Sequence, residues 1–518
     1  MSVEERSEHL RRRVARNALS NYIGRGIMLA MGFFLTPFLL GRLGAEHYGL
    51  WLLVGSVMAY AELLEFGITG AVIKFIAEHY ARRAFDSAQR MMATAIALYA
   101  FLGLLVVALS LALAPVFPRL FQVPAEDAAT ASQLVLLMGV SMALNLAGSI
   151  NWTILHGLQR FDLDNLVSTL AAVLTNIAIV ITVLLGGGVL GLVLATIGVG
   201  VVMQVFGLWV MLRAAPELRL SLRGASLAEA RTIMRFGSAL FFGRFAGRLK
   251  SQTDDIVIGS VLSVAAIAPY SVAQRLSELS QTLTDQFTKV LEPLASQLDA
   301  EKDLAGLRAL FLTSTRVTLA IFLPVACGFT ILSVPFLTLW VGAAYAHQPE
   351  LVTILMLAVL LDTMATPGIL IVQGMARHQP LAWIALGSGL LNLALSIILA
   401  QRVGLVGVAV GTLVPTTVEV ACLVLPYQLR TIGTPVRDYI LAAVLPALLP
   451  ALPLCLWLNA ALIWFQPTSW FGLFWVGGVG AGIYSLVYLS LPATALERRS
   501  LLRFARPYLA RLGRPPVG

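Results

Sequence analysis

The chain has 518 residues and a formal net charge of +9, and it is 58% hydrophobic but only 12% charged, with a mean hydropathy of +0.85. This composition is typical of a polytopic membrane protein and excludes a soluble domain with a single anchor. The three cysteines lie inside apolar runs and form no CxxC pattern, so they indicate neither a metal site nor a redox centre.

A membrane-spanning helix needs about 20 mostly apolar residues. Such runs are predicted at 19–40, 48–71, 91–114, 131–156, 163–185, 189–212, 237–262, 267–292, 308–332, 351–374, 381–400, 404–426, 438–462 and 469–492. The seventh and eighth runs are the least apolar. We therefore predict an all-α polytopic membrane protein with about 14 transmembrane helices, each roughly as long as the bilayer core is thick.

Lysine and arginine are concentrated in alternate loops. One side of the membrane receives 26 of them, and the other receives only Arg42, Arg119 and Arg402. Because positively charged loops stay in the cytoplasm, both termini are predicted to be cytoplasmic. The same distribution explains the net charge as a topology signal and as contact with anionic lipids, so no nucleic-acid partner is expected.

Two parts of the chain resemble each other. HGLQR at 156–160 recurs as QGMAR at 373–377, and GVLGLVLAT from Gly188 recurs as GLVGVAVGT from Gly404. The offsets are 217 and 216 residues, which predicts two six-helix lobes in the same orientation, followed by two further helices. The expected organisation is an N-terminal lobe at 1–212, a basic cytoplasmic linker at 213–236, a C-terminal lobe at 237–430, a helix pair at 431–493 and a basic cytoplasmic tail at 494–518.

Charged residues form stripes on the first two helices of each lobe. A charge at the centre of a spanning helix costs roughly 2.5–3.5 kcal/mol, so such charges are expected to face a wet cavity or one another. We predict that the stripes share a cleft between the lobes. Lys74 and Lys289 are expected to extend to the cytoplasmic interface, and Lys250 and Asp254 to be structural. The candidate substrate-binding residues are Arg25, Glu62, Arg244, Arg248, Asp255 and Arg275.

The sequence also excludes several mechanisms. It contains neither GxxxxGK[ST] nor HExxH, and its external loops are short and nearly uncharged. ATP-driven transport and catalysis are therefore disfavoured, and no enzymatic activity, cofactor or bound metal is expected. Several arginines in a cavity suit an anionic substrate, because guanidinium binds phosphate oxygens in a bidentate manner. Transport would then be driven by an ion gradient or by removal of the substrate.

Three segments carry a family resemblance: FLTPFLLGRLGAEHYGLW, ELLEFGITGAVIKFIAE and DDIVIGSVLSVAAIAPYSVAQRL. With their order and spacing, the first 430 residues or so resemble the polysaccharide transport (Wzx-like) family of the MOP exporter superfamily, whose members adopt a MATE- and MurJ-like V-shaped arrangement. The resemblance implies a monomeric flippase in the bacterial inner membrane. It would move an undecaprenyl-pyrophosphate-linked oligosaccharide, such as an O-antigen precursor, by alternating access, alongside a glycan polymerase and a chain-length regulator.

The resemblance also implies coupling to H⁺ or Na⁺. In lipid II flippases, a sodium site joins an acid of the seventh helix to polar groups of the eleventh and twelfth helices. The corresponding candidates here, with two further acids, are Asp255, Asp285, Asp362, Asn392 and Thr412. Glu419 is a further isolated polar residue of the second lobe that could be a cation ligand, and for Asp362, Asn392 and Glu419 an ordinary hydrogen bond in the core remains an open alternative. Two other functions stay open: a MATE-like antiporter of drugs, amphiphiles or cations, disfavoured because the first helix has no acid, and a membrane glycan polymerase or ligase.

Overall fold

The computed structural model describes residues 3–495, 497 and 498, and for some of these, including 3–25, it describes the backbone alone. The described residues are almost entirely helical and contain no β-strand. By their internal contacts they form two compact units, the described residues up to 269 with 400–404 and the described residues of 270–399 and from 405 onward. The predicted all-α fold is confirmed.

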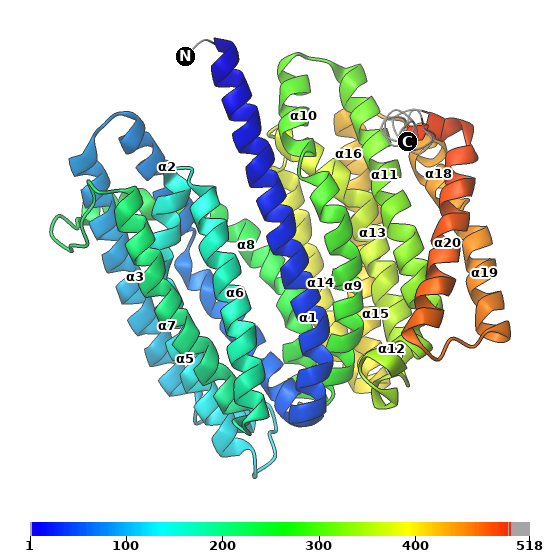
Figure 1. The fold of residues 1–518 in the computed structure, drawn as a ribbon, viewed down its shortest axis with the longest axis horizontal. Coiled ribbons are helices and arrows are strands. Elements are labelled where there is room, and N and C mark those ends of the chain that lie inside the picture. The colour runs from blue at the N-terminus through cyan, green and yellow to red at the C-terminus, as the bar shows by residue number, and fades with distance from the viewer. Residues whose placement is uncertain (1–2, 496, 499–518) are drawn as a thin grey trace, which may run out of the picture. The chain divides into compact units, whose positions relative to one another are not determined.

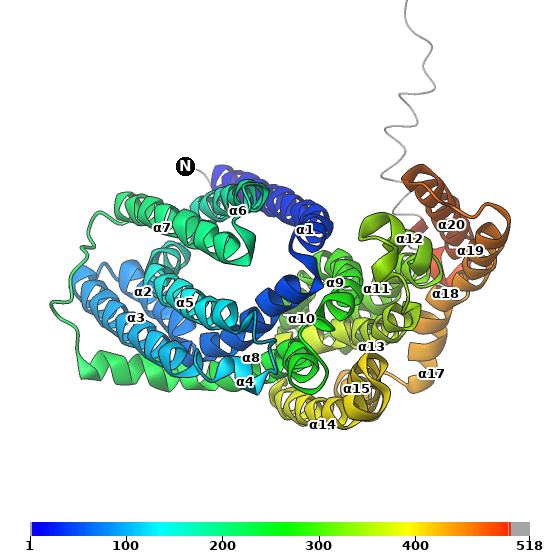
Figure 2. The same cartoon turned by 90° about the horizontal axis from the view of Figure 1, so that it is seen from below.

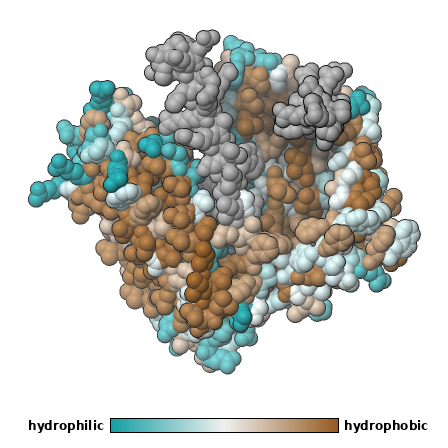
Figure 3. All heavy atoms as spheres, viewed as in Figure 1, coloured by the Kyte–Doolittle hydropathy of each residue, from teal (hydrophilic) through white to brown (hydrophobic). Residues whose placement is uncertain are grey.

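The first unit is built from long helices that pack side by side. α3 packs on α5, α5 and α6 pack on α7, and α8 packs against α1, α2 and α3 (Figures 1 and 2). Exposed apolar side chains cover the middle of α3, α6 and α7, with hydrophilic residues toward the ends (Figure 3). The elements are α1 (Val3–Ala61), η1 (Glu62–Glu65), α2 (Ile68–Ala81), α3 (Phe85–Leu113), α4 (Phe117–Leu120), α5 (Ala128–Gly157), α6 (Phe161–Leu184), α7 (Gly188–Ala214) and α8 (Leu227–Val261).

The second unit has its core around α11 and α13, with Phe311, Leu319 and Ile371 fully buried. Its helices are α9 (Ile267–Thr288), α10 (Leu291–Ala300), α11 (Leu304–Ile331), α12 (Ser333–Trp340), α13 (Pro349–Gly374), α14 (Gln379–Val403), α15 (Leu405–Thr417), α16 (Leu425–Ile432), α17 (Val436–Asp438), α18 (Leu445–Leu448), α19 (Ala451–Trp464) and α20 (Trp470–Ser490). Its short 3₁₀ and π elements are η2 (Ala343–Tyr345), η3 (Val418–Val424), η4 (Tyr439–Val444) and η5 (Pro492–Thr494).

Every predicted span falls on helical residues, and several of them cover more than one consecutive element. Within the described residues, ten helices are long and apolar enough to cross a membrane, or eleven if the bent pair Ala30–Glu65 and Ile68–Ala81 is one span. The predicted spans at 19–40, 237–262 and 267–292 fall on the first part of α1, on α8 and on α9. The chain is thus a multi-pass membrane protein, and the total of about 14 spans stays a prediction based on span length.

The segment between α7 and α8 ends at Ser226. Ser226 caps the N-terminus of α8 by accepting a hydrogen bond from the Glu229 backbone N–H at 3.1 Å. From Leu227 the helix continues without interruption to Val261, because nothing in residues 227–236 breaks a helix. By its contacts α8 belongs to the first unit, and the predicted lobe and linker boundaries stay predictions.

Backbone turns repeat along the chain with the sequence repeat. Positive φ angles of 55° and 57° occur at Arg83 and Lys302, which follow α2 and α10. Gln159 and Ala376, which follow α5 and α13, both have φ of 56°. These residues are 219 and 217 apart, close to the offsets found in the sequence. Since non-glycine residues rarely adopt such angles, their recurrence is structural evidence for the internal repeat.

Candidate functional site

A row of polar contacts joins α1 and η1 to α8 within the first unit. Ser56 Oγ donates to Asp255 Oδ2 at 2.7 Å. The Tyr60 hydroxyl and Thr253 Oγ1 share a hydrogen bond of 2.7 Å. We call this row the α1–α8 seam, and its members are Ser56, Tyr60, Glu62, Arg248, Thr253 and Asp255.

The seam ends in an ion pair. Arg248 Nη2 donates to Glu62 Oε2, and the two side chains are 35% and 47% exposed. Thr253, further along, is buried at 2%. An exposed ion pair contributes only about 0–1 kcal/mol to stability, so this pair is not what holds the helices together. Its accessible guanidinium remains available to an anionic ligand.

Glycines fix the antiparallel register of the seam. A Cβ on Gly67 would lie 2.6 Å from the carbonyl oxygen of Gly237, and a Cβ on Gly49 would collide with the carbonyl oxygen of Val264. Gly67 also has φ of 72°, a conformation that glycine adopts without strain. Close backbone approach at both ends therefore aligns the polar residues of α1 and η1 with those of α8.

Glu65, three residues beyond Glu62, has a different task. Its Oε1 accepts a hydrogen bond of 2.9 Å from the backbone N–H of Thr69, in the first turn of α2. A carboxylate in this position satisfies an otherwise unpaired donor and complements the helix dipole. The two acids of η1 therefore have different roles: Glu65 caps α2, and Glu62 faces α8.

The other predicted substrate residues do not join this seam in the described structure. Arg275 lies on α9, in the second unit, where it is exposed and pairs with Glu278 at 3.1 Å. Asp285 is half-buried on the same helix. The side chains of Arg25 and Arg244 lie outside the described residues. The roles predicted for these residues, and the shared cleft between lobes, stay predictions.

Two of the predicted cation ligands contact each other in the second unit. Asn392 Nδ2 on α14 donates to Thr412 Oγ1 on α15 at 3.1 Å. Asn392 is 3% exposed, and Ser396, one turn further along α14, is fully buried. Asp362 is half-buried on α13. No group of three or more His, Cys, Asp or Glu residues that could hold a metal ion occurs among the described residues.

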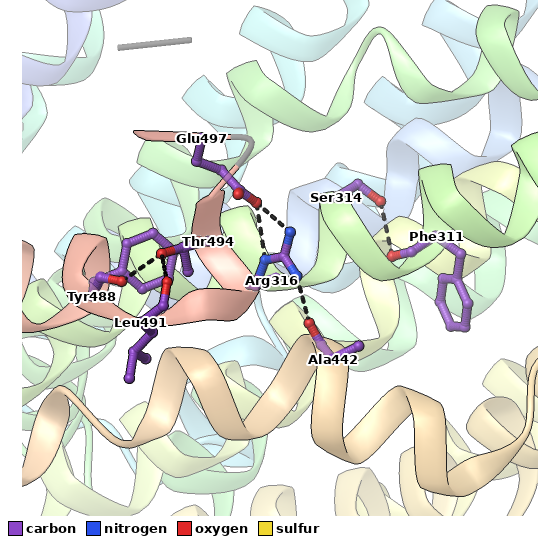
Figure 4. Close-up of polar contacts among 8 residues, drawn as sticks. All are labelled: Phe311, Ser314, Arg316, Ala442, Tyr488, Leu491, Thr494 and Glu497. Carbon is purple, nitrogen blue, oxygen red and sulfur yellow. Dashed lines mark hydrogen bonds and ion pairs between the residues drawn. The ribbon is translucent and has the colours of Figure 1, made fainter. Parts of the chain in front are cut away.

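One buried charge escaped the sequence analysis. Arg316 on α11 is 5% exposed, and Glu497 Oε1 accepts hydrogen bonds from its Nε at 2.9 Å and from its Nη2 at 2.5 Å (Figure 4). Its Nη1 donates to the carbonyl oxygen of Ala442 at 2.7 Å. An arginine inside the apolar run 308–332 was a readable signal. Its partner, at the start of a basic tail, was not.

Comparison with known proteins gives a consistent result. The family model described as "Polysaccharide biosynthesis protein" matches residues 39–349. The succinoglycan biosynthesis transport protein ExoT of Rhizobium meliloti is 25% identical over 375 residues, which are 72% of each chain.

Solved structures show the same fold at lower identity. The lipid II flippase MurJ in an inward closed conformation has a TM-score of 0.71 at 17% identity and covers 94% of this chain and 100% of its own. An inward-facing MATE multidrug transporter of the MOP superfamily has a TM-score of 0.67 at 17% identity, covering 80% of this chain and 94% of its own. These likenesses confirm the predicted MurJ- and MATE-like helical fold.

Proposed function

Because this chain belongs to the polysaccharide biosynthesis protein family, we propose that it is a flippase for a lipid-linked oligosaccharide. It acts as a secondary transporter and not as an enzyme. The substrate is an oligosaccharide on undecaprenyl pyrophosphate, moved across the bacterial inner membrane by alternating access coupled to H⁺ or Na⁺. Both termini face the cytoplasm, and the protein works as a monomer beside a glycan polymerase and a chain-length regulator.

The observation that carries the proposal is the accessible Arg248–Glu62 pair at the end of the α1–α8 seam. Guanidinium forms strong bidentate bonds to phosphate oxygens, and a charge within a membrane-spanning segment usually marks a substrate or ion pathway. Glu62 holds the guanidinium while no substrate is present. A pyrophosphate, with more charge and more acceptor oxygens, replaces the carboxylate when the substrate binds.

The experiment must separate substrate binding from pairing with Glu62. We expect Arg248→Ala to abolish glycan export in cells, while membrane abundance and melting temperature stay near those of the wild type. The decisive variant removes both charges, Glu62→Gln with Arg248→Gln. If Arg248 serves only as the partner of Glu62, the double variant exports glycan normally. If it binds substrate, the double variant is as inactive as Arg248→Ala.

A second measurement distinguishes this proposal from drug export. In inverted membrane vesicles, the wild-type protein is expected to leave the distribution of organic cations unchanged when a proton gradient is imposed. Accumulation of an organic cation that depends on the protein and the gradient would instead favour a MATE-like antiporter.

A further inference from the structure

A buried carboxylate lies at the middle of a membrane-spanning segment of the second unit. Glu419 is in the candidate span Leu405–Ile432, 14 residues from its first residue and 13 from its last. It is only 8% exposed. A charge at the centre of a span is costly and usually marks an ion or substrate pathway. From the sequence alone, this residue could be a cation ligand or could make an ordinary hydrogen bond in the core.

The neighbouring helix supplies a matched hydrogen-bond donor. Ser388 Oγ on α14 donates to Glu419 Oε2 at 2.8 Å. One turn along α14, Asn392 makes its own hydrogen bond to Thr412. Two successive turns of α14 thus present polar groups to the same helix across the membrane interior.

The basic residues of α14, α15, η3 and α16 are Arg402 and Arg430, and each lies near the end of its helix. Arg430 is 11 residues from Glu419, about 16 Å along a helix axis at 1.5 Å per residue. Arg402 is 14 residues beyond Ser388, in the last turn of α14. The titratable and charged side chains on α13, α14, α15, η3 and α16 are Glu350, Asp362, Arg402, Glu419, Cys422, Tyr427 and Arg430.

The backbone around Glu419 is not a regular α-helix. Residues Val418–Val424 form the π-helix η3, which is followed by Pro426. Proline lacks a backbone N–H, and its ring collides with the carbonyl four residues earlier, here that of Cys422. Pro415 imposes the same restriction one turn before Glu419. Single π turns inside helices occur frequently at functional sites, and here one carries the buried acid.

We propose that Glu419 is a proton-binding site that couples the movement of protons to transport, an inference that rests on the proposed flippase function. A bound metal ion needs several oxygen ligands, and the described residues contain no group of three or more His, Cys, Asp or Glu that could hold one. A proton needs a single oxygen. The carboxylate takes up one proton from water and becomes a neutral carboxyl, and it returns that proton to water when it ionises.

Proton binding changes the hydrogen bonds that Glu419 can form between η3 and α14. The ionised carboxylate only accepts hydrogen bonds, whereas the protonated carboxyl can also donate one. The neutral form suits a closed, dry contact between α14 and η3, and the ionised form requires water at the same place. Since the two forms favour different packing of these helices, a proton gradient biases the conformational equilibrium.

The direct test is infrared difference spectroscopy on the purified full-length protein, titrated from acid to alkaline pH. We expect a protonated-carboxyl C=O band that disappears as the pH rises, is absent in Glu419→Gln and persists in Glu350→Gln, which removes an exposed acid at the start of α13. A band unchanged in Glu419→Gln would overturn the proposal. Should Glu419→Gln not fold, Ser388→Ala gives the second readout, because loss of its hydrogen bond must shift the band to higher frequency.

A transport assay then separates this inference from the proposed function. In cells exporting glycan, a protonophore should reduce the wild-type rate, and Glu419→Gln should abolish that sensitivity. A Glu419 band without any glycan export by the wild type would retain the proton site and refute the flippase. Normal, protonophore-sensitive export by Glu419→Gln would retain the flippase and refute the proton site.

Discussion

Arg316 and Glu497 form a buried ion pair between residues 181 positions apart, and this pair joins the end of the described chain to α11. Their side chains are only 7% and 13% exposed. The third partner of Arg316 is the carbonyl of Ala442, in the π-helix η4. Pro446 follows four residues later and has no N–H to offer that carbonyl, so the guanidinium takes the place of the missing backbone donor.

Removal of the acid should be strongly destabilising. In Glu497→Ala the guanidinium of Arg316 stays buried without its counter-charge, which typically costs about 3–5 kcal/mol. We expect a clear drop in the melting temperature of the detergent-purified protein. Replacing both residues with apolar ones, Arg316→Met with Glu497→Leu, should recover most of the loss. Equal melting temperatures for Glu497→Ala and the wild type would show that the pair is not formed.

The proline gives a second, independent prediction. Pro446→Ala supplies an N–H that can bond the carbonyl of Ala442, so Arg316 becomes less important. In that background, Arg316→Met should cost about 1 kcal/mol less than in the wild type, the usual value of one hydrogen bond. The measurement is a double-mutant cycle in denaturant. The matched control is Pro426→Ala, which supplies no N–H to the carbonyl of Ala442. It should leave the effect of Arg316→Met unchanged.

The glycine contact at the bend between η1 and α2 predicts position-specific sensitivity. Gly67→Ala should lower the melting temperature markedly, because its Cβ would meet the backbone of Gly237 and its φ is positive. Gly198→Ala on α7 is the control, since no atom lies within 4 Å of the added Cβ. There, alanine should be neutral or stabilising by up to about 1 kcal/mol. Similar losses at both positions would contradict the close packing seen at Gly67.

Variants of Ser56 and Asp255, which share a hydrogen bond, test the prediction that Asp255 takes part in cation coupling. Ser56→Ala removes a donor from Asp255 and should cost roughly 1 kcal/mol of stability, with export retained. Asp255→Asn keeps the size and a hydrogen bond but removes the charge. If Asp255 binds the coupling ion, export in this variant should lose its dependence on the ion gradient. Gradient-dependent export by Asp255→Asn would assign Asp255 a structural role only.

Much of the fold could be predicted because its signals are local. Span positions follow from the length of apolar runs, and the N-terminus of α8 follows from Ser226 with Glu229. The sequence repeat at 156–160 and 373–377 includes Gln159 and Ala376, the two residues that form the matching turns. These features depend on residues that are close in the sequence, so they can be predicted from one sequence.

Other features depend on partners that are distant in sequence. The seam between α1 and α8 requires the register set by Gly49, Gly67 and Gly237, whose close contacts no spacing rule reveals. Helical spacing placed Arg248 and Asp255 on a polar face but could not show that Glu62 and Ser56 face them. Glu497, the partner of Arg316, lies at the start of a basic tail whose sequence indicates only membrane orientation. In each case tertiary packing selected one partner among many polar residues.

The matching turns after α5 and α13 have a consequence for the history of the chain. Gln159 and Ala376 share the same left-handed angle although neither is glycine and the two residues differ in chemistry. The backbone shape was therefore kept while the side chains diverged, as expected after duplication and fusion of a gene of about half the length. An even number of crossings leaves both copies facing the same way. An ancestral polypeptide of that length would have formed a two-lobed transporter by pairing with itself.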